Sequence, residues 1–138
     1  MTERGVIRNR GHAMQIRDFG GLRWGTITPT DIDGVVDFQD KAYVLFELKF
    51  GNTDVPFGQR LAIERMCQDW HKVGKKVLGL IARHNTPYPG DIDVSLAQVV
   101  EVLRLPKNGS PYWGAPQMPL TVKEATDLFL HYHKIVTT

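Results

Sequence analysis

Residues 33–50 of this chain read Asp-Gly-Val-Val-Asp-Phe-Gln-Asp-Lys-Ala-Tyr-Val-Leu-Phe-Glu-Leu-Lys-Phe. A short apolar run at 34–38 precedes a polar turn at 39–41, and a longer run of aliphatic and aromatic residues follows at 42–50. β-Branched and aromatic residues favour strands, and polar residues between two such runs favour a turn. The stretch therefore predicts a β-hairpin, and the rest of the fold is expected to build on it.

Three charged side chains are expected to meet at one edge of this hairpin. Because side chains alternate along a strand, Glu47 and Lys49 point to the same face. Asp33 stands at the start of the first strand, which the short turn brings back beside Glu47. The apolar run around Glu47 is typical of a buried central strand, where a solvated ion pair would be unusual.

Two adjacent carboxylates suit a hard divalent cation. Magnesium prefers oxygen ligands and commonly takes one or two protein carboxylates, leaving positions for water and substrate phosphate. Asp33 and Glu47 are therefore candidate metal ligands, and Lys49 could orient a water molecule or neutralise a phosphate. The alternative is a salt bridge between Glu47 and Lys49 on a solvated strand, because such pairs are common and weak.

Charge is segregated along the chain around this candidate site. Residues 26–59 carry six acidic and two basic side chains, whereas the flanking segments 1–25 and 60–84 have net charges of +3 and +4. Basic segments around an acidic centre are typical of a phosphate-binding groove around a metal site.

Three arginines in the basic segments are candidates for DNA binding. Arg8 and Arg10 belong to a possible basic N-terminal arm over residues 1–21, for which the alternative is a solvated terminus. Arg60 lies in the first turn of the helix expected after the hairpin, where backbone donors also favour phosphate.

Asp33, followed fourteen residues later by Glu47-Leu48-Lys49 in strands joined by a tight turn, resembles the core of the PD-(D/E)XK nuclease superfamily. Archaeal-type Holliday-junction resolvases and small phage nucleases match it in length and spacing, over roughly residues 24–84. The resemblance implies that Asp33 and Glu47, with the Leu48 carbonyl, bind Mg²⁺, for which Mn²⁺ can substitute. It also implies that Lys49 assists the hydrolytic water and that Gln59, on the next helix, contacts the site or the DNA.

The chain departs from the resolvase pattern near its N-terminus. Those enzymes usually carry a glutamate on an amphipathic first helix, whereas residues 1–25 lack helical periodicity and hold only Glu3 and Asp18 as acids. Asp31 is an alternative start of the acidic motif. We prefer Asp33 because it leads directly into the apolar strand, and we expect Asp31 to cap the turn or to support the metal ligands.

Further elements are expected on both sides of the hairpin. A strand is predicted over 22–28, and an amphipathic helix over 56–73, preceded by capping residues at 52–54. Residues 76–84 read as a buried strand, parallel to the strand at 42–50 through the helical crossover. Within the predicted helix, Glu64 is the simplest partner for Arg60, four residues earlier.

The C-terminal third is predicted to hold an edge strand over 97–105 and a long loop over 106–119. Aromatic residues in that loop, Tyr112 and Trp113, could stack on unpaired bases, or pack over the core or a dimer partner. A capping box at 121–124 begins the last helix. The expected fold is α/β, with a mixed central sheet of four to five strands flanked by helices in a restriction-endonuclease-like core.

Composition sets bounds on these expectations. The 138 residues, 42% of them hydrophobic, suit one domain over 1–138. Because Cys67 is the single cysteine, an intramolecular disulfide and a multi-cysteine zinc site are excluded. No apolar stretch approaches the 18 residues of a membrane span, so we expect a cytoplasmic protein, in the host cytoplasm if phage-encoded.

The expected function is magnesium-dependent, structure-specific cleavage of DNA, in particular of a four-way junction. Symmetric paired cuts would require a homodimer with two-fold symmetry. The sequence is also compatible with three alternatives. They are a nuclease of the same fold acting on linear, nicked or single-stranded DNA, a catalytically inactive nucleic-acid-binding module, and an interaction protein in which the three charged residues form only a salt-bridged cluster.

Overall fold

The computed structural model describes Gln15 and residues 18–137 and divides the chain into two compact units, Met1–Thr30 and Asp31–Thr138. In the smaller unit, Trp24 and Ile27 exchange backbone hydrogen bonds of 2.9 and 3.0 Å across a turn in which Gly25 has a φ of 65°. The strand predicted over 22–28 is therefore wrong, because the chain reverses within it. The predicted DNA-binding residues Arg8 and Arg10 lie outside the described residues.

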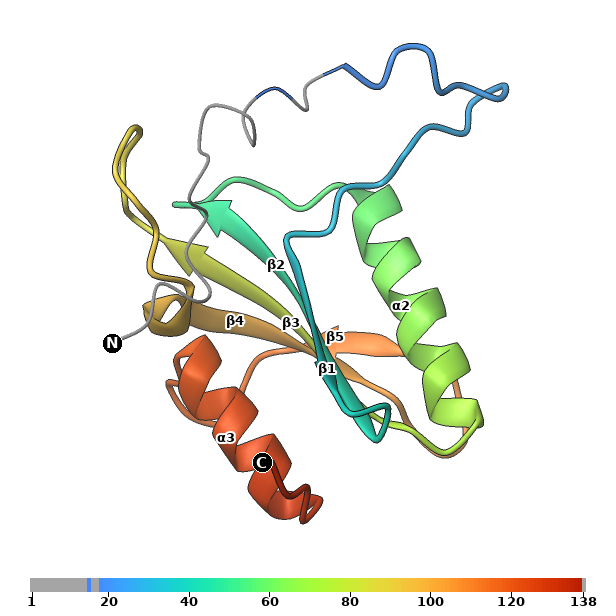
Figure 1. Cartoon of the computed structure of the whole chain (residues 1–138), viewed down its shortest axis with the longest axis vertical. Coiled ribbons are helices and arrows are strands. Elements are labelled where there is room, and N and C mark those ends of the chain that lie inside the picture. The colour runs from blue at the N-terminus through green and yellow to red at the C-terminus, as the bar shows by residue number, and fades with distance from the viewer. Residues whose placement is uncertain (1–14, 16–17, 138) are drawn as a thin grey trace. The chain divides into compact units, whose positions relative to one another are not determined.

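The larger unit has an α/β fold built on one five-stranded sheet (Figure 1). The strands lie in the order β1 (Gly34–Phe38), β2 (Ala42–Phe50), β3 (Lys76–His84), β4 (Gln98–Arg104) and β5 (Tyr112–Gly114). Only β2 and β3 are parallel, and the other neighbours are antiparallel. The predicted mixed sheet and the parallel crossover are confirmed.

Two helices cover opposite faces of the sheet, α2 (Phe57–Lys72) and α3 (Val122–Tyr132), and a short 3-10 turn, η1 (Val94–Leu96), precedes β4 (Figure 1). On one face, α2 contributes Ile63 and Cys67 to a core with Leu45 and Leu103. On the other face, α3 packs its Phe129 over the alternate residues of the same strands, among them Val44, Ala82 and Val102. The central strands are therefore buried on both sides, which explains their continuous apolar runs.

The hairpin has the predicted turn and a register that sets the candidate site. Gln39 and Asp40 adopt positive φ angles of 57° and 61° in the turn. The pair nearest the open end is Gly34 with Phe46, so the next residues outward, Asp33 and Glu47, lie opposite each other. A Cβ atom on Gly34 would come within 2.1 Å of the Phe46 ring, so the ring can lie over this position because glycine has no side chain.

The helix predicted over 56–73 is confirmed with small shifts, but its predicted capping residues are not. Pro56 is the N-cap of α2 and makes no side-chain capping bond. The segment before it is tied instead to the end of β3, because Arg83 donates to the Gly51 carbonyl at 3.0 Å and the Gly51 amide donates to the His84 carbonyl at 2.9 Å. These bonds fix the loop that joins β2 to α2.

The C-terminal third differs from expectation at one sheet edge. The strand predicted over 97–105 exists as β4 but is not the edge, because β5 forms within the segment predicted to be a loop and pairs Trp113 with Leu103. The predicted capping box is confirmed at α3, where Thr121 and Glu124 bond reciprocally at 3.1 and 2.9 Å.

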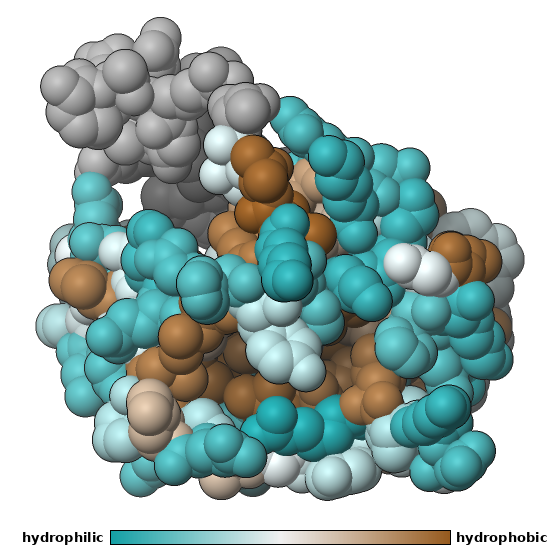
Figure 2. Space-filling model, turned by 90° about the horizontal axis from the view of Figure 1, so that it is seen from below, coloured by the Kyte–Doolittle hydropathy of each residue, from teal (hydrophilic) through white to brown (hydrophobic). Residues whose placement is uncertain are grey.

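The end of the molecule that carries the β1–β2 turn and the last turn of α3 is seen in Figure 2, where hydrophobic residues gather in the middle of the face within a hydrophilic surround. Among the described residues, no helix has the length and apolar character that a membrane crossing requires. The face seen in Figure 2 lies away from the open end of the hairpin, where Asp33 and Glu47 meet.

Candidate active site

The hairpin brings Asp33 and Glu47 together, as their spacing predicts. Asp33 is exposed, and its Oδ2 accepts a hydrogen bond of 2.7 Å from the Leu48 amide, directly after Glu47. Glu47 is only 2% exposed, although it is charged in its ordinary state. The predicted buried strand is therefore confirmed, and with it the unusual position of a carboxyl group inside it.

The two oxygens of Glu47 have different surroundings. Lys49 Nζ lies 3.5 Å from Oε1, on the same strand face as expected. Oε2 is buried and has no hydrogen-bond partner among the described residues. An unpartnered buried carboxylate oxygen is costly, so its presence calls for an explanation.

Gln59 presents a second oxygen of the same kind. Its Nε2 donates 3.1 Å to the Asp31 carbonyl, which anchors the first turn of α2 to the segment leading into β1. With the amide nitrogen committed there, the Gln59 Oε1 atom is buried without a partner within the described part of the chain. Asp31 thus contacts Gln59 through its backbone carbonyl, and this bond holds the side chain of Gln59 against the acidic segment.

Electrostatics at the site disfavour a second negative charge. Burial first, and then the charge of Asp33, raise the pKa of Glu47 from 4.5 to about 7, while Lys49 opposes the shift. Glu47 therefore shares its region of the site with a like charge in a poorly solvated position. A positive ligand would relieve both penalties at once.

These donors fit a hard divalent cation. The arrangement offers carboxylate oxygens from Asp33 and Glu47, among them the buried Oε2 atom that has no partner, and Gln59 adds a buried amide oxygen on a side chain bonded to Asp31. Magnesium needs only one or two protein carboxylates, because water and substrate phosphate complete its shell. In the part of the chain that the structure describes, no cluster of three or more histidine, cysteine, aspartate or glutamate side chains suits a metal. The two carboxylates fit a site in which water and phosphate supply the other ligands.

Arg60 does not pair with Glu64, which corrects the simplest sequence interpretation. Its Nη2 lies 2.6 Å from Oε2 of Glu101 on β4, and its guanidinium carbon lies 5.6 Å from the centre of the Trp113 ring. Glu64 instead accepts a 2.9 Å hydrogen bond from Trp113 Nε1. These contacts hold the indole of Trp113, on β5, against α2. Trp113 therefore packs within the fold, and its Nε1–H is already hydrogen-bonded.

Glu101 was missed by reasoning from the sequence, although a signal was available. It interrupts the apolar run of β4 as Glu47 interrupts that of β2. In register, Glu101 pairs with Ile81 and Ile81 pairs with Glu47, so the three lie in one row across the face that α2 covers. A lone acid in a buried strand was the feature to follow in both cases.

Comparisons with protein-family models, with curated proteins and with solved structures found no significant match to this chain. The geometry therefore carries the functional inference. Asp33, Glu47 and Lys49 lie together, Gln59 is anchored beside the acidic segment, and Arg60 lies farther across the same sheet face. Arg83, by contrast, holds the loop after β2 and has a structural role.

Proposed function

We propose that this protein is a magnesium-dependent DNA endonuclease whose preferred substrate is branched DNA, in particular a four-way junction. The observation that carries the proposal is the buried, unpartnered Oε2 of Glu47 beside Asp33. A cation-binding pair of carboxylates with an adjacent lysine suits phosphodiester hydrolysis. Manganese, which also accepts oxygen ligands, should substitute for magnesium.

Asp33 and Glu47 would hold the metal, with Gln59 as a further oxygen donor. When bound, the ion supplies a water of lowered pKa and neutralises charge on the phosphate. In the hydrolysis, the water oxygen bonds to phosphorus, the bond to the leaving oxygen breaks, the water loses a proton and the leaving oxygen gains one. Lys49, whose side chain is 19% exposed beside Glu47, orients the attacking water and balances the charge that develops on phosphorus.

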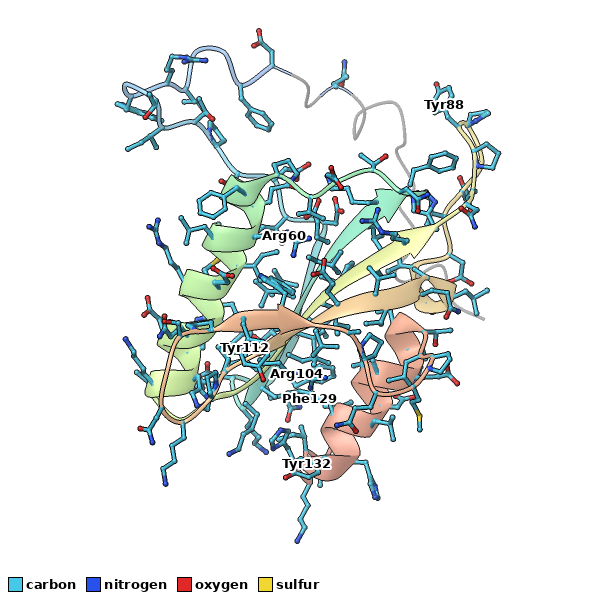
Figure 3. The ribbon with its side chains drawn as sticks, turned by 180° about the vertical axis from the view of Figure 1, so that it is seen from behind. Arg60, Tyr88, Arg104, Tyr112, Phe129 and Tyr132 are labelled. Atoms are coloured by element: carbon cyan, nitrogen blue, oxygen red, sulfur yellow. The ribbon has the colours of Figure 1, made fainter. Side chains whose placement is uncertain are left out.

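The preference for branched DNA is supported by the surface near the open end of the hairpin. Tyr88 is 85% exposed on the loop that follows β3, and Phe57 is 76% exposed at the start of α2. Figure 3 shows Tyr88 projecting from the tip of its loop, away from the body of the sheet. Exposed aromatic rings stack on bases that lack a stacking neighbour, as occur where strands exchange.

The test is a cleavage assay on a panel of labelled DNAs in magnesium. A four-way junction, its component duplexes, a nicked duplex and a single strand are compared with wild-type protein and Glu47→Ala. We expect cutting of the junction above the other substrates, and loss of cutting with retained binding in the variant. Equal rates on junction and duplex would refute the junction preference, and no cleavage of any DNA in magnesium or manganese would refute the nuclease.

A junction-resolving enzyme must also cut two strands symmetrically. The proposal therefore includes a homodimer with a two-fold axis. Analytical ultracentrifugation with and without junction DNA measures the stoichiometry. Two chains per junction are expected, and one chain per junction would contradict paired cutting.

A further inference from the structure

Arg60 is held in a network that leaves much of its hydrogen-bonding capacity unused. The guanidinium has five N–H donors, and Nη2 donates a 2.6 Å hydrogen bond to Glu101, which is the one hydrogen-bond acceptor of Arg60's side chain among the described residues. Its side chain is 26% exposed and that of Glu101 is 28% exposed, so solvent reaches the pair. The guanidinium carbon also lies over the Trp113 ring, 5.6 Å from its centre, and the bond from Trp113 to Glu64 fixes the indole.

The network also lies at a useful separation from the carboxylate pair. Glu101 and Glu47 are two strands apart on one face of the sheet, with Ile81 between them. At ~4.8 Å per strand, the two positions are about 10 Å apart. A DNA strand rises ~3.4 Å per nucleotide, so this interval covers a few nucleotides of one backbone. Figure 3 shows Arg60 between α2 and the sheet.

We propose that Arg60 forms a second phosphate-binding subsite, which takes a backbone phosphate a few nucleotides from the one that is cut. In the free protein the guanidinium of Arg60 is paired with the Glu101 carboxylate. When DNA binds, phosphate oxygens replace that carboxylate as the hydrogen-bond acceptors of Arg60. The inference rests on the proposed function and extends it, because it names a contact outside the carboxylate pair.

The chemistry of the group favours this role over a fixed structural pair. A planar guanidinium matches two phosphate oxygens at once, and the contact with the Trp113 ring restricts where the guanidinium lies before the ligand arrives. A lysine could provide the charge but not the oriented fork. A partly exposed ion pair contributes little to stability, so its exchange for a phosphate costs little.

The test measures DNA binding in EDTA, where the metal-dependent reaction does not occur. Fluorescence anisotropy gives the dissociation constant of a labelled junction as a function of salt for wild type, Arg60→Gln and Glu101→Gln. Loss of one phosphate contact lowers the slope of log affinity against log salt by about 0.9, so Arg60→Gln should bind more weakly and with that smaller slope. Glu101→Gln should bind roughly two- to five-fold more tightly, because Arg60 no longer has to leave a carboxylate.

A double variant separates exchange from simple repulsion of DNA by Glu101. If the carboxylate acts through Arg60, the Glu101→Gln change has no effect once Arg60 is already glutamine. Tightening that persists in Arg60→Gln/Glu101→Gln would overturn the exchange, and an unchanged salt slope in Arg60→Gln would overturn the subsite. Arg104→Gln is the matched control, because Arg104 lies on β4, the strand that carries Glu101, and donates to the Ala115 carbonyl at 3.3 Å.

Arg60→Lys keeps the readout valid if the glutamine variant folds poorly. It retains the charge and the helix but lacks the fork, so the salt slope should remain and the affinity should fall. Affinity equal to wild type in Arg60→Lys would refute the role of the guanidinium fork. Loss of cleavage in Glu47→Ala with normal binding by Arg60→Gln would refute the subsite alone, whereas wild-type protein that binds no DNA would refute both proposals.

Discussion

Replacing Glu47 with glutamine should stabilise the metal-free protein at pH 8 and leave its stability almost unchanged at pH 4. Burial and the charge of Asp33 raise the pKa of Glu47 from 4.5 to about 7. The folded protein therefore holds this proton more tightly than the unfolded chain does. The stability that Glu47 contributes is complete below pH 4.5 and is lost as the pH rises through 7.

The size of the effect follows from the shift. A rise from 4.5 to about 7 corresponds to ~3 kcal/mol at ~1.4 kcal/mol per pH unit. Glutamine has nearly the same shape and cannot ionise, so Glu47→Gln avoids this loss. We expect its free energy of unfolding at pH 8 to exceed that of wild type by about 2–3 kcal/mol, with much of the difference gone at pH 4.

The assay is urea unfolding in EDTA between pH 4 and pH 8.5. Asp127→Asn is the control, because Asp127 forms an exposed pair with Lys123 at 2.7 Å on α3. Magnesium at 100 times its dissociation constant should then stabilise wild type by about 2.7 kcal/mol and Glu47→Gln by much less. Parallel pH profiles for wild type and Glu47→Gln would refute the electrostatic account of the site.

Three further substitutions test the hairpin, the C-terminal helix and the exposed tyrosine. Gly34→Ala would bring a Cβ within 2.1 Å of the Phe46 ring, and we expect a loss of about 1–3 kcal/mol in urea unfolding; an unchanged midpoint would refute the close approach. Thr121→Ala removes half of the capping box and should cost about 1 kcal/mol in the same assay, whereas no loss would contradict the cap. Tyr88→Ser should weaken binding to DNA with unpaired bases by roughly tenfold in anisotropy, while Tyr132→Ser, 79% exposed at the opposite end of the molecule (Figure 3), should not; equal effects would remove the stacking role.

The hairpin and its charged residues could be predicted because their signals are local. Alternation along one strand fixes the shared face of Glu47 and Lys49, and a three-residue turn fixes the position of Asp33. The capping box of α3 is local in the same way. In each case a few adjacent residues specify the structure without help from distant parts of the chain.

Features that depend on distant partners were predicted less well. Arg60 was assigned to Glu64, four residues away on the same helix, but it pairs with Glu101, 41 residues away on β4. The start of α2 was assigned to polar capping residues, whereas the end of β3 holds that segment through Arg83. β5 is only three residues long, and no periodic pattern of that length can be recognised in a loop rich in glycine and proline.

The central claim is that Asp33 and Glu47 hold a divalent cation that hydrolyses DNA, and cleavage by Glu47→Gln tests it most directly. The rate of junction cleavage in magnesium is measured under single-turnover conditions for wild type, Glu47→Gln and the control Asp127→Asn, with folding checked by urea unfolding. We predict cleavage by wild type and the control, and a loss of at least about 100-fold in Glu47→Gln, because a neutral amide replaces a charged ligand. Cleavage by Glu47→Gln at the wild-type rate would contradict the account.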